Sequence, residues 1–291
     1  MKVLVTGANG QLGTALRRLA PVGVDVVAAD VQELDIADAA QVGREMRRIG
    51  PALVINAAAY TQVDKAESDR EAAFRVNGLA PRLLAEAAAA QKAHLIHVST
   101  DFVFSGDRPV PYEPDAATGP LSVYGESKLA GEQAVLAALG AAATVVRTSW
   151  LYAADGRNFV KTMLSLMATR DLIGVVVDQV GSPTWASSLA QAIWDMAQKP
   201  AIHGIQHWAD EGVASWYDFA VAIQEEALAR GLLTRAIPVQ AIPASAYPTP
   251  ARRPRYSVLD KSRTASLLGY RPPHWRQSLR NMLDELAASS P

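Results

Sequence analysis

Lys2-Val-Leu-Val-Thr6-Gly7-Ala-Asn-Gly10-Gln-Leu-Gly13 is the stretch that decides the fold. A short apolar run, typical of a buried strand, enters a turn with glycines at every third position, and an amphipathic stretch follows. Gly7 suits a tight turn from strand to helix, Gly10 lets the backbone approach a pyrophosphate, and Gly13 lets the helix pack closely on the sheet. The amides and dipole at the helix N-terminus favour phosphate groups. The stretch therefore predicts a dinucleotide-binding turn, although its spacing is G-x-x-G-x-x-G rather than G-x-G-x-x-G.

Acidic and small residues follow the next two predicted strands. Asp30 closes the second strand 23 residues after Gly7, where a carboxylate can accept hydrogen bonds from the adenosine ribose. Asp35 and Ile36 could hold the adenine edge, and Asp35 could equally be the N-cap of the next helix. Residues 56–59, Asn-Ala-Ala-Ala, offer a flat surface for a cofactor, or the alanines serve packing alone. The plain alternative for the whole motif is three turn glycines and a surface aspartate.

A tyrosine and a lysine lie four positions apart in Tyr124-Gly-Glu-Ser-Lys128. On a helix both side chains project from one face. A tyrosine at its ordinary pKa is a poor acid–base catalyst at neutral pH, and a nearby ammonium is expected to lower that pKa. Lys128 can also reach ribose hydroxyls, and Thr100, at the end of an apolar strand, can hydrogen-bond a substrate carbonyl beside Tyr124. The alternative is an exposed Tyr–Lys helix pair near a strand-ending turn.

Apolar runs and amphipathic stretches alternate through the first half of the chain, which predicts βαβ units and a parallel sheet. Strands are expected at 2–6, 25–29, 52–57, 94–99 and 144–147. Helices are expected at 11–20, 38–49, 63–90 and 123–139, with an interruption near 78–81 left open. The predicted fold class is α/β, a Rossmann-type doubly wound parallel sheet with a smaller, interleaved C-terminal substrate lobe.

The pattern becomes irregular after about residue 150. Helices are expected near 158–168, 186–198 and 215–231, and strands near 173–178 and 203–208. Five prolines between 238 and 254 predict an extended stretch, which on its own would be a linker. We expect a dinucleotide-binding domain over 1–155, to which segments at about 186–208 and 243–260 return, and a mainly substrate-binding lobe over 156–291.

The composition excludes several classes of protein. The chain has 291 residues with 49% hydrophobic and 20% charged residues, values typical of a globular protein. A net charge of −1 gives no electrostatic footprint for nucleic acid or an anionic membrane. The start of the chain has no secretory signal and no apolar run approaches 18 residues, so we expect a soluble, cytoplasmic protein. With no Cys and five scattered His we expect no metal site.

The chain resembles the extended short-chain dehydrogenase/reductases and, within them, the dTDP-4-dehydrorhamnose reductases. The glycine turn and the Tyr–Lys pair are general to the superfamily, and the other matching segments are more particular to this branch. The matching segments are residues 7–13, 56–61, 63–67, 99–104, 124–132, 147–150, 158–163, 178–179, 183–184, 247–251 and 253–254.

The resemblance implies a role for each matching residue. Tyr124 would be the proton donor, Thr100 would orient the C4 carbonyl, and Lys128 would bind the nicotinamide ribose. Asp101 and Trp150 would lie beside the sugar. The other residues implied at the cofactor are Gly10, Gln11 and Leu12 at the pyrophosphate, and Asp30, Asp35, Ile36, Ala59, Tyr60 and Thr61 along the groove.

The sequence also departs from the family pattern. Phe102 stands where the family often has Tyr, which removes a hydroxyl near the substrate, and Arg255-Tyr256 replace the small or amide pair that often precedes the serine. Some members bind magnesium through acidic residues at a dimer contact, but the first helix offers Ala15 and Arg17 there, so the metal is not expected in this chain.

Two ligand predictions rest on charge. Arg252 and Arg253 could bind the diphosphate of a nucleotide sugar. Arg253 is favoured because it belongs to the Arg-Pro pair that matches the family. The alternative is that both are solvated arginines on a surface linker. Residues 31–34 after Asp30 offer no Arg or Lys to a 2′-phosphate, so NADH should be used at least as well as NADPH, unless Arg17 or Arg18 turns toward that phosphate.

The resemblance implies NADPH- or NADH-dependent reduction of the C4 keto group of dTDP-4-dehydro-L-rhamnose to dTDP-L-rhamnose, a precursor of cell-surface polysaccharides such as lipopolysaccharide. The substrate would be a dTDP-linked 4-keto-6-deoxysugar, and a homodimer is conceivable. Three alternatives stay open: a reductase of another nucleotide-linked 4-ketosugar, an epimerase on the same scaffold, and a non-catalytic NAD(P)-binding regulatory subunit of another enzyme. The Thr100, Tyr124 and Lys128 set argues against the last of these, because a binder needs no acid–base pair.

Overall fold

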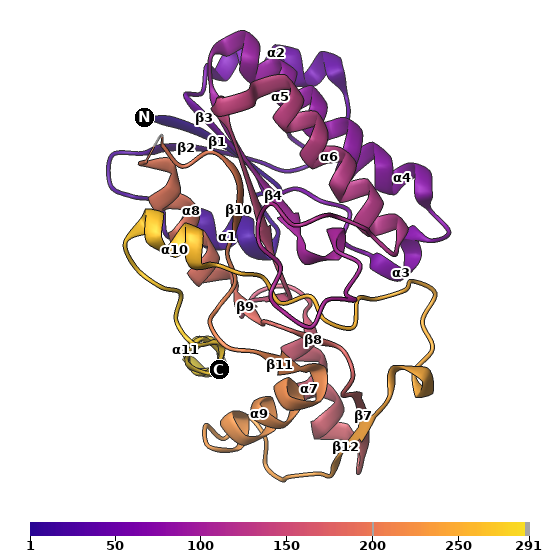
Figure 1. The fold of residues 1–291 in the computed structure, drawn as a ribbon. Coiled ribbons are helices and arrows are strands. Elements are labelled where there is room, and N and C mark those ends of the chain that lie inside the picture. The colour runs from indigo at the N-terminus through magenta and orange to yellow at the C-terminus, as the bar shows by residue number, and fades with distance from the viewer. Residues whose placement is uncertain (200, 289–291) are drawn as a thin grey trace.

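The computed structural model of the chain describes residues 1–199 and 201–288 and is built around a parallel sheet (Figure 1). The strands follow the order β10-β5-β4-β3-β1-β2, and every neighbouring pair runs parallel. This confirms the predicted doubly wound α/β class. The strands of this sheet are β1 (Lys2–Thr6), β2 (Asp25–Ala29), β3 (Leu53–Asn56), β4 (His94–Thr100), β5 (Ala143–Thr148) and β10 (Gly204–His207).

Helices cover both faces of the sheet because successive side chains of a strand point to opposite sides. Val3 and Val5 of β1 pack in a core with α1 (Gln11–Arg18) and α8 (Ala186–Ala197). Leu4, between them, packs on the other face with α2 (Ala39–Ile49), α5 (Ala80–Gln91) and α6 (Val123–Leu139). Figure 1 shows these two helical layers on either side of the strands. The near-continuous apolar strands of the sequence follow from this double burial.

Side-chain caps fix where two of these helices begin. Ser122 accepts a hydrogen bond from the Gly125 amide and starts α6 where the sequence predicts it. Asp38 accepts from the Ala40 and Gln41 amides and starts α2. The N-cap alternative for Asp35 is therefore wrong, because that role belongs to Asp38.

The single helix expected over 63–90 is divided into shorter pieces. They are α3 (Val63–Ala66), α4 (Arg70–Phe74), a π-helical stretch η1 (Arg75–Leu79) and then α5. The chain leaves the helix at 67–69 and widens over 75–79, so the interruption considered near 78–81 overlaps the widened stretch only at 78–79 and misses the earlier break. Pro81 sits in the first turn of α5, where its missing amide costs no hydrogen bond.

The remaining elements build a second core below the sheet in Figure 1. This core joins α7 (Phe159–Thr169), α9 (Trp216–Leu228) and α11 (Trp275–Ala288) to β7 (Ile173–Val176) and β12 (Val239–Ile242). Because β12 pairs with β7 in parallel, the interpretation of residues 238–254 as only a linker is wrong for this strand. The smaller elements are β6 (Leu151–Tyr152) with β9 (Thr184–Trp185), β8 (Val180–Gly181) with β11 (Ala214–Ser215), the turns η2 (Asp101–Val103), η3 (Gly140–Ala142) and η4 (Ala244–Ala246), and α10 (Ser262–Leu268).

The strand order changes direction between β1 and β3, since β2 lies on one side of β1 and all later strands lie on the other. In open α/β sheets the carboxyl ends of the strands at such a point form the binding crevice. Within the described residues no helix has the length and apolar character needed to cross a membrane.

Candidate active site

The glycine turn lies at the point where the strand order reverses. Gly7 has a φ of +67°, and a Cβ placed there would come within 2.6 Å of the Ala58 backbone after β3. A Cβ on Gly13 would come within 2.1 Å of the Gly7 carbonyl oxygen, so α1 can pack against the turn only without a side chain at position 13. The turn and the two strand ends are thus held in direct backbone contact.

The N-terminus of α1 fits a pyrophosphate. Gly10 is its N-cap and provides no capping side chain, unlike the caps of α2, α6, α7 and α9. The amides of its first turn, at Gln11, Leu12 and Gly13, have no intrahelical acceptor and can donate to an anion. The Gln11 side chain accepts a 2.9 Å hydrogen bond from Asn158, the N-cap of α7, and so connects the turn to the second core.

Asp30 lies against the glycine turn. One carboxylate oxygen accepts the Asn9 amide at 2.9 Å and the other accepts the Val31 amide at 2.8 Å. Arg17 reaches the same place, since its guanidinium lies 3.4 Å from both the Ala8 carbonyl and the Asn9 side-chain oxygen. A cation thus stands beside the glycine turn, next to the Asn9 amide that binds Asp30.

The other residues expected along the cofactor groove differ in their surroundings. Asp35 pairs with Arg75 at 2.6 Å, and Ile36 is buried in the core beneath α2. Ala59 and Tyr60 are half-buried and Thr61 is exposed on the loop after β3. The Tyr60 hydroxyl donates to Asp69 at 3.2 Å, and its ring packs in the same small cluster as Tyr124.

Tyr124 and Lys128 project from the first turns of α6 toward the carboxyl end of β4. Lys128 is 2% exposed, and its ammonium donates a 2.7 Å hydrogen bond to the Val98 carbonyl of β4. Tyr124 is half-buried, and Phe102 stands edge-on to its ring with centroids 5.7 Å apart. The phenylalanine that replaces the family's common tyrosine thus packs directly against the phenol ring.

The expectation of a Tyr124 pKa below its ordinary value is wrong for this structure, because burial outweighs any opposing charge. Burial raises the pKa of Tyr124 to about 12, the Asp101 carboxylate acts in the same direction, and Thr100 opposes them. Burial also lowers the pKa of Lys128 to about 8, against the opposite effect of Glu132. The ammonium is directed to the Val98 carbonyl, and the phenol remains protonated at neutral pH.

Thr100 and Asp101 form a buried hydrogen-bonded group beside the phenol. The Thr100 hydroxyl donates to Asp101 at 3.1 Å and accepts the Phe102 amide at 3.2 Å. The second Asp101 oxygen accepts the Ser257 hydroxyl at 2.5 Å. Burial raises the pKa of Asp101 to about 6, and these hydrogen bonds lower it in part. Ser257 arrives from a distant part of the sequence.

Sequence reasoning from chemistry missed Asn77, which lies in the π-helical stretch η1. Its amide oxygen accepts the Tyr60 amide at 2.9 Å, and its nitrogen donates to the Tyr60 carbonyl and to the Ser127 hydroxyl, each at 3.0 Å. Ser127 in turn donates to the Tyr124 carbonyl at 2.8 Å. Asn77 therefore connects the loop after β3 to the helix of the Tyr–Lys pair, and no residue pattern in the sequence indicates this role.

Trp150 follows β5 with a φ of +48°, a conformation that costs energy in any residue with a Cβ. Its indole stacks on Trp216 of α9, with ring centroids 3.5 Å and planes 5° apart. The aromatic pair connects the carboxyl end of the sheet to the second core.

Arg253 makes a bidentate ion pair with Asp64 of α3, at 3.0 and 2.7 Å. The same guanidinium also donates to the Thr249 hydroxyl at 2.5 Å and to the Ala251 carbonyl at 3.2 Å. It thus holds the proline segment, residues 243–254, against the helix that follows the cofactor loop. Arg252 is exposed.

The structure brings the glycine turn, the loop after β3, the Thr100–Asp101 pair and the Tyr124–Lys128 pair to one edge of the sheet. Asp35 and Arg253 instead form ion pairs with protein groups. Across residues 1–199 and 201–288 no three His, Cys, Asp or Glu side chains gather in a way that could hold a metal ion.

Comparisons with known proteins give the family. Residues 1–288 match the family described as RmlD substrate binding domain. The dTDP-4-dehydrorhamnose reductase of Aggregatibacter actinomycetemcomitans is 41% identical, with 97% of this chain and 98% of the relative covered. A probable dTDP-4,6-dihydroxy-2-methyloxan-3-one 4-ketoreductase of Streptomyces antibioticus is 44% identical over 100% of this chain and 98% of the relative.

A solved structure agrees with this result. The dTDP-4-dehydrorhamnose reductase of Bacillus anthracis, in complex with NADP, is 37% identical with a TM-score of 0.91, covering 98% of this chain and 99% of that one. Fold, site geometry and full-length similarity agree, and the chain belongs to the dTDP-4-dehydrorhamnose reductase family.

Proposed function

We propose that the chain reduces the C4 keto group of dTDP-4-dehydro-L-rhamnose to a hydroxyl, giving dTDP-L-rhamnose, with NADPH or NADH as the reductant. The observation that carries this proposal is the position of Tyr124 and Lys128 beside Thr100, at the same sheet edge as the uncapped N-terminus of α1. Relatives of about 40% identity over the full length carry this activity in their names.

The cofactor would lie across the strand reversal. The amides of Gln11, Leu12 and Gly13 would hold its pyrophosphate, and Asp30 would accept from the adenosine ribose. Ala59, Tyr60 and Thr61 would border the nicotinamide half, and Lys128 would bind the second ribose. When bound, the reduced nicotinamide supplies a hydride to the sugar C4.

Tyr124 would supply the proton that completes the reduction. A pKa near 12 keeps its hydroxyl protonated at neutral pH, which is the state that a proton donor needs. Hydride addition turns the weakly basic carbonyl into an alkoxide, a base strong enough to take the proton from the phenol. The phenolate left behind would be stabilised by the Lys128 ammonium.

Thr100 would orient the carbonyl oxygen toward Tyr124. Its hydroxyl donates to Asp101 in this structure, and a small rotation would direct it to the substrate. Asp101 would then be held by Ser257. Trp150, in its strained conformation, would place the indole against the sugar, and the Trp150–Trp216 stack would limit the space open to it.

The separate hydrophobic cores support a division of the chain into a cofactor-binding part and a substrate-binding part. We assign cofactor binding to residues 1–155 with the returning segments at about 186–208 and 243–260, and substrate binding mainly to 156–291. The pairing of β10 with β5 and the Asp101–Ser257 hydrogen bond support the two returns. The homodimer and the cytoplasmic location stay predictions.

A reductase of another nucleotide-linked 4-ketosugar is the second candidate, because the Streptomyces antibioticus relative carries a different ketosugar in its name. Both candidates use the same acid–base residues and differ only in the sugar. The purified protein should therefore be assayed for NADPH and NADH oxidation with dTDP-4-dehydro-L-rhamnose, and the product read by NMR.

The proposal expects stoichiometric cofactor oxidation and a 6-deoxysugar with a new C4 hydroxyl. Product without net cofactor oxidation would indicate an epimerase. Cofactor binding with no turnover of several dTDP-ketosugars would favour the regulatory subunit.

A further inference from the structure

Three charged side chains are buried on α6 and the neighbouring strand β5. Lys128 and Glu132 lie four residues apart on α6, and Arg147 lies on the neighbouring strand β5. They are 2%, 1% and 2% exposed. Buried charges are unfavourable unless they are paired and hydrogen-bonded. The two buried cations, Lys128 and Arg147, therefore require the carboxylate of Glu132.

Glu132 is fixed by Arg147. The guanidinium donates to one carboxylate oxygen at 2.9 Å and to the other at 3.2 and 2.6 Å. The remaining terminal nitrogen donates to the Pro114 carbonyl at 3.2 Å, and the guanidinium stands 5.0 Å from the centre of the Phe104 ring. These contacts hold the Glu132 side chain in one conformation.

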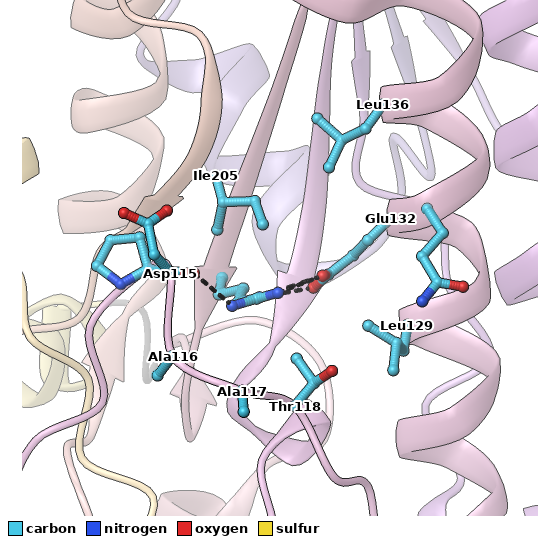
Figure 2. Close-up of a pocket in the computed structure, with 11 residues that line it drawn as sticks. Asp115, Ala116, Ala117, Thr118, Leu129, Glu132, Leu136 and Ile205 are labelled. Atoms are coloured by element: carbon cyan, nitrogen blue, oxygen red, sulfur yellow. Dashed lines mark hydrogen bonds and ion pairs between the residues drawn. The ribbon is translucent and has the colours of Figure 1, made fainter.

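The pair lines a pocket of about 280 Å³ together with residues 114–118, Gln133 and three hydrophobic side chains. Figure 2 shows the Glu132 carboxylate pointing from its helix toward the chain of residues 115–118, with dashed lines to its partner. Lys128, Tyr124 and Thr100 do not line this pocket.

Lys128 has few partners of its own. Its ammonium donates to the Val98 carbonyl, a neutral group. The Glu132 carboxylate favours the charged form of Lys128, against the burial that disfavours it. Four residues apart on a helix, the two side chains lie on the same face. The carboxylate is thus the charge that compensates the buried ammonium.

The other titratable groups around α6 do not replace Glu132. On β4, His97 is buried and neutral, because burial and the Lys128 charge hold its pKa well below the usual range. On η2, the Asp101 carboxylate acts on Tyr124. The charged side chains of the other helices packed against α6 are largely exposed: Asp64 and Lys65 of α3, Arg70 of α4, Arg75 of η1, and Arg82 and Glu86 of α5.

We propose that Glu132, held in place by Arg147, is a positioning residue that keeps the Lys128 ammonium charged while Tyr124 donates its proton. The inference rests on the proposed function, since it assigns this task within the same reaction. It goes beyond packing, because the Glu132 carboxylate favours the charged form of Lys128, which a pair that only packs would not do.

Glu132→Gln leaves two buried cations without their shared anion, so Lys128 should lose its proton more readily. Arg147→Met removes a cation and leaves the anion to Lys128 alone, so Lys128 should keep its proton more firmly. A purely structural pair would destabilise the protein in both variants without shifting Lys128 in opposite directions. Glu126→Gln is the matched control, since Glu126 lies on the same helix but pairs with Arg70 at the surface.

The readout is the ionisation of Lys128 in the whole protein, followed by NMR after labelling the seven lysines with ¹³C at Cε. The Lys128→Arg variant assigns the signal. The basic limb of the kcat/KM profile is measured in parallel. We expect the pH at the midpoint of the Lys128 titration to fall by at least about one unit in Glu132→Gln, to rise in Arg147→Met and to stay unchanged in Glu126→Gln. Glu132→Asp, which keeps the charge, should recover at least half of the shift.

A Lys128 midpoint in Glu132→Gln within about 0.3 pH units of the unsubstituted protein, or a fall in Arg147→Met, overturns the inference. If Glu132→Gln does not fold, the direction of the shift in Arg147→Met decides. Absence of ketosugar reduction by the unsubstituted protein would refute the proposed function, and the NMR titration would still decide whether Glu132 controls the charge of Lys128.

Discussion

Replacing Tyr124 with Phe removes one oxygen atom from the reaction centre and leaves the ring in place. The ring packs edge-on against Phe102 and belongs to the small cluster with Tyr60 and Phe74. Because these contacts persist, we expect the free energy of unfolding to change by about 1 kcal/mol at most. Any large effect on turnover would then report on chemistry rather than on folding.

The size of the effect follows from what remains in the site. General acid catalysis is typically worth about 10² to 10⁴ in rate, which corresponds to about 2.7 to 5.5 kcal/mol of activation free energy. The nearest other hydroxyl, that of Thr100, donates its proton to Asp101 at 3.1 Å, and Ser257 holds Asp101 on its other side. Thr100 is therefore a poor substitute donor, and kcat should fall by about 10³ or more.

The pH dependence of the unsubstituted enzyme adds a second check. Because the pKa of Tyr124 is about 12, its hydroxyl stays protonated up to pH 10, and loss of its proton cannot cause a fall in rate below that pH. The pKa of Lys128 is about 8, so the rate should fall as the pH rises through this value. A flat profile to pH 10 would contradict the role of Lys128.

The assay is steady-state NADPH oxidation with dTDP-4-dehydro-L-rhamnose, together with a fluorescence titration of cofactor binding to the same samples. The expected result for Tyr124→Phe is a greatly reduced kcat and a cofactor Kd within about twofold of the original. A variant that retains more than about a tenth of kcat would remove Tyr124 from the proton-donor role.

Three further predictions concern other charged groups. Arg253→Ala should raise the substrate KM and leave cofactor affinity unchanged. An equal rise of KM in Asp64→Asn would show that the guanidinium acts by holding the proline segment, whereas a smaller rise would show direct binding of the diphosphate. An unchanged KM in a folded Arg253→Ala variant would mean that the segment has only a structural role. The enzyme should use NADH at least as well as NADPH, and a preference of the unsubstituted enzyme for NADPH above about tenfold in kcat/KM would contradict this prediction. Asp30→Ala should shift kcat/KM toward NADPH, because the 2′-phosphate would no longer be repelled by that carboxylate. Burial raises the pKa of Asp210 to about 6, so its contribution to stability is present below pH 3.8 and lost as the pH rises through 6. Asp210→Asn should therefore raise the free energy of unfolding at pH 8 by up to about 3 kcal/mol and not at pH 4, as urea titrations at both pH values would show.

Local signals were sufficient for several elements in the first half of the chain. The strands at 2–6 and 25–29 and the helix at 123–139 have the predicted bounds, because each is an apolar run or a capped stretch bounded by polar, Gly or Pro residues. The Tyr–Lys pair was equally visible, since four-residue spacing on a helix fixes a shared face.

Features that depend on distant partners were not visible. The strand β12 exists because it pairs with β7, and its own residues alternate too weakly to indicate a strand. The π-helical stretch at 75–79 contains Asn77, whose hydrogen bonds to Tyr60 and Ser127 join distant segments that no periodicity shows. Helices α10 and α11 were also not predicted.

The electrostatics of the site were the least predictable part. The pKa of Tyr124 depends on how far the fold buries its hydroxyl, and burial raises that pKa to about 12. Ser257 stands 156 residues from Asp101 in sequence, so only a fold or a family match could place the two together. The partner of Arg253 was hidden for the same reason, since Asp64 lies 189 residues away.

Isotope transfer tests the central claim most directly. The purified protein should be given NADPH that carries deuterium at the reactive position of nicotinamide C4, together with dTDP-4-dehydro-L-rhamnose, and the product analysed by NMR and mass spectrometry. We predict dTDP-rhamnose with one deuterium at C4 of the sugar and one equivalent of oxidised cofactor. Product without deuterium at C4, or no product while the cofactor binds, would contradict hydride transfer to the sugar.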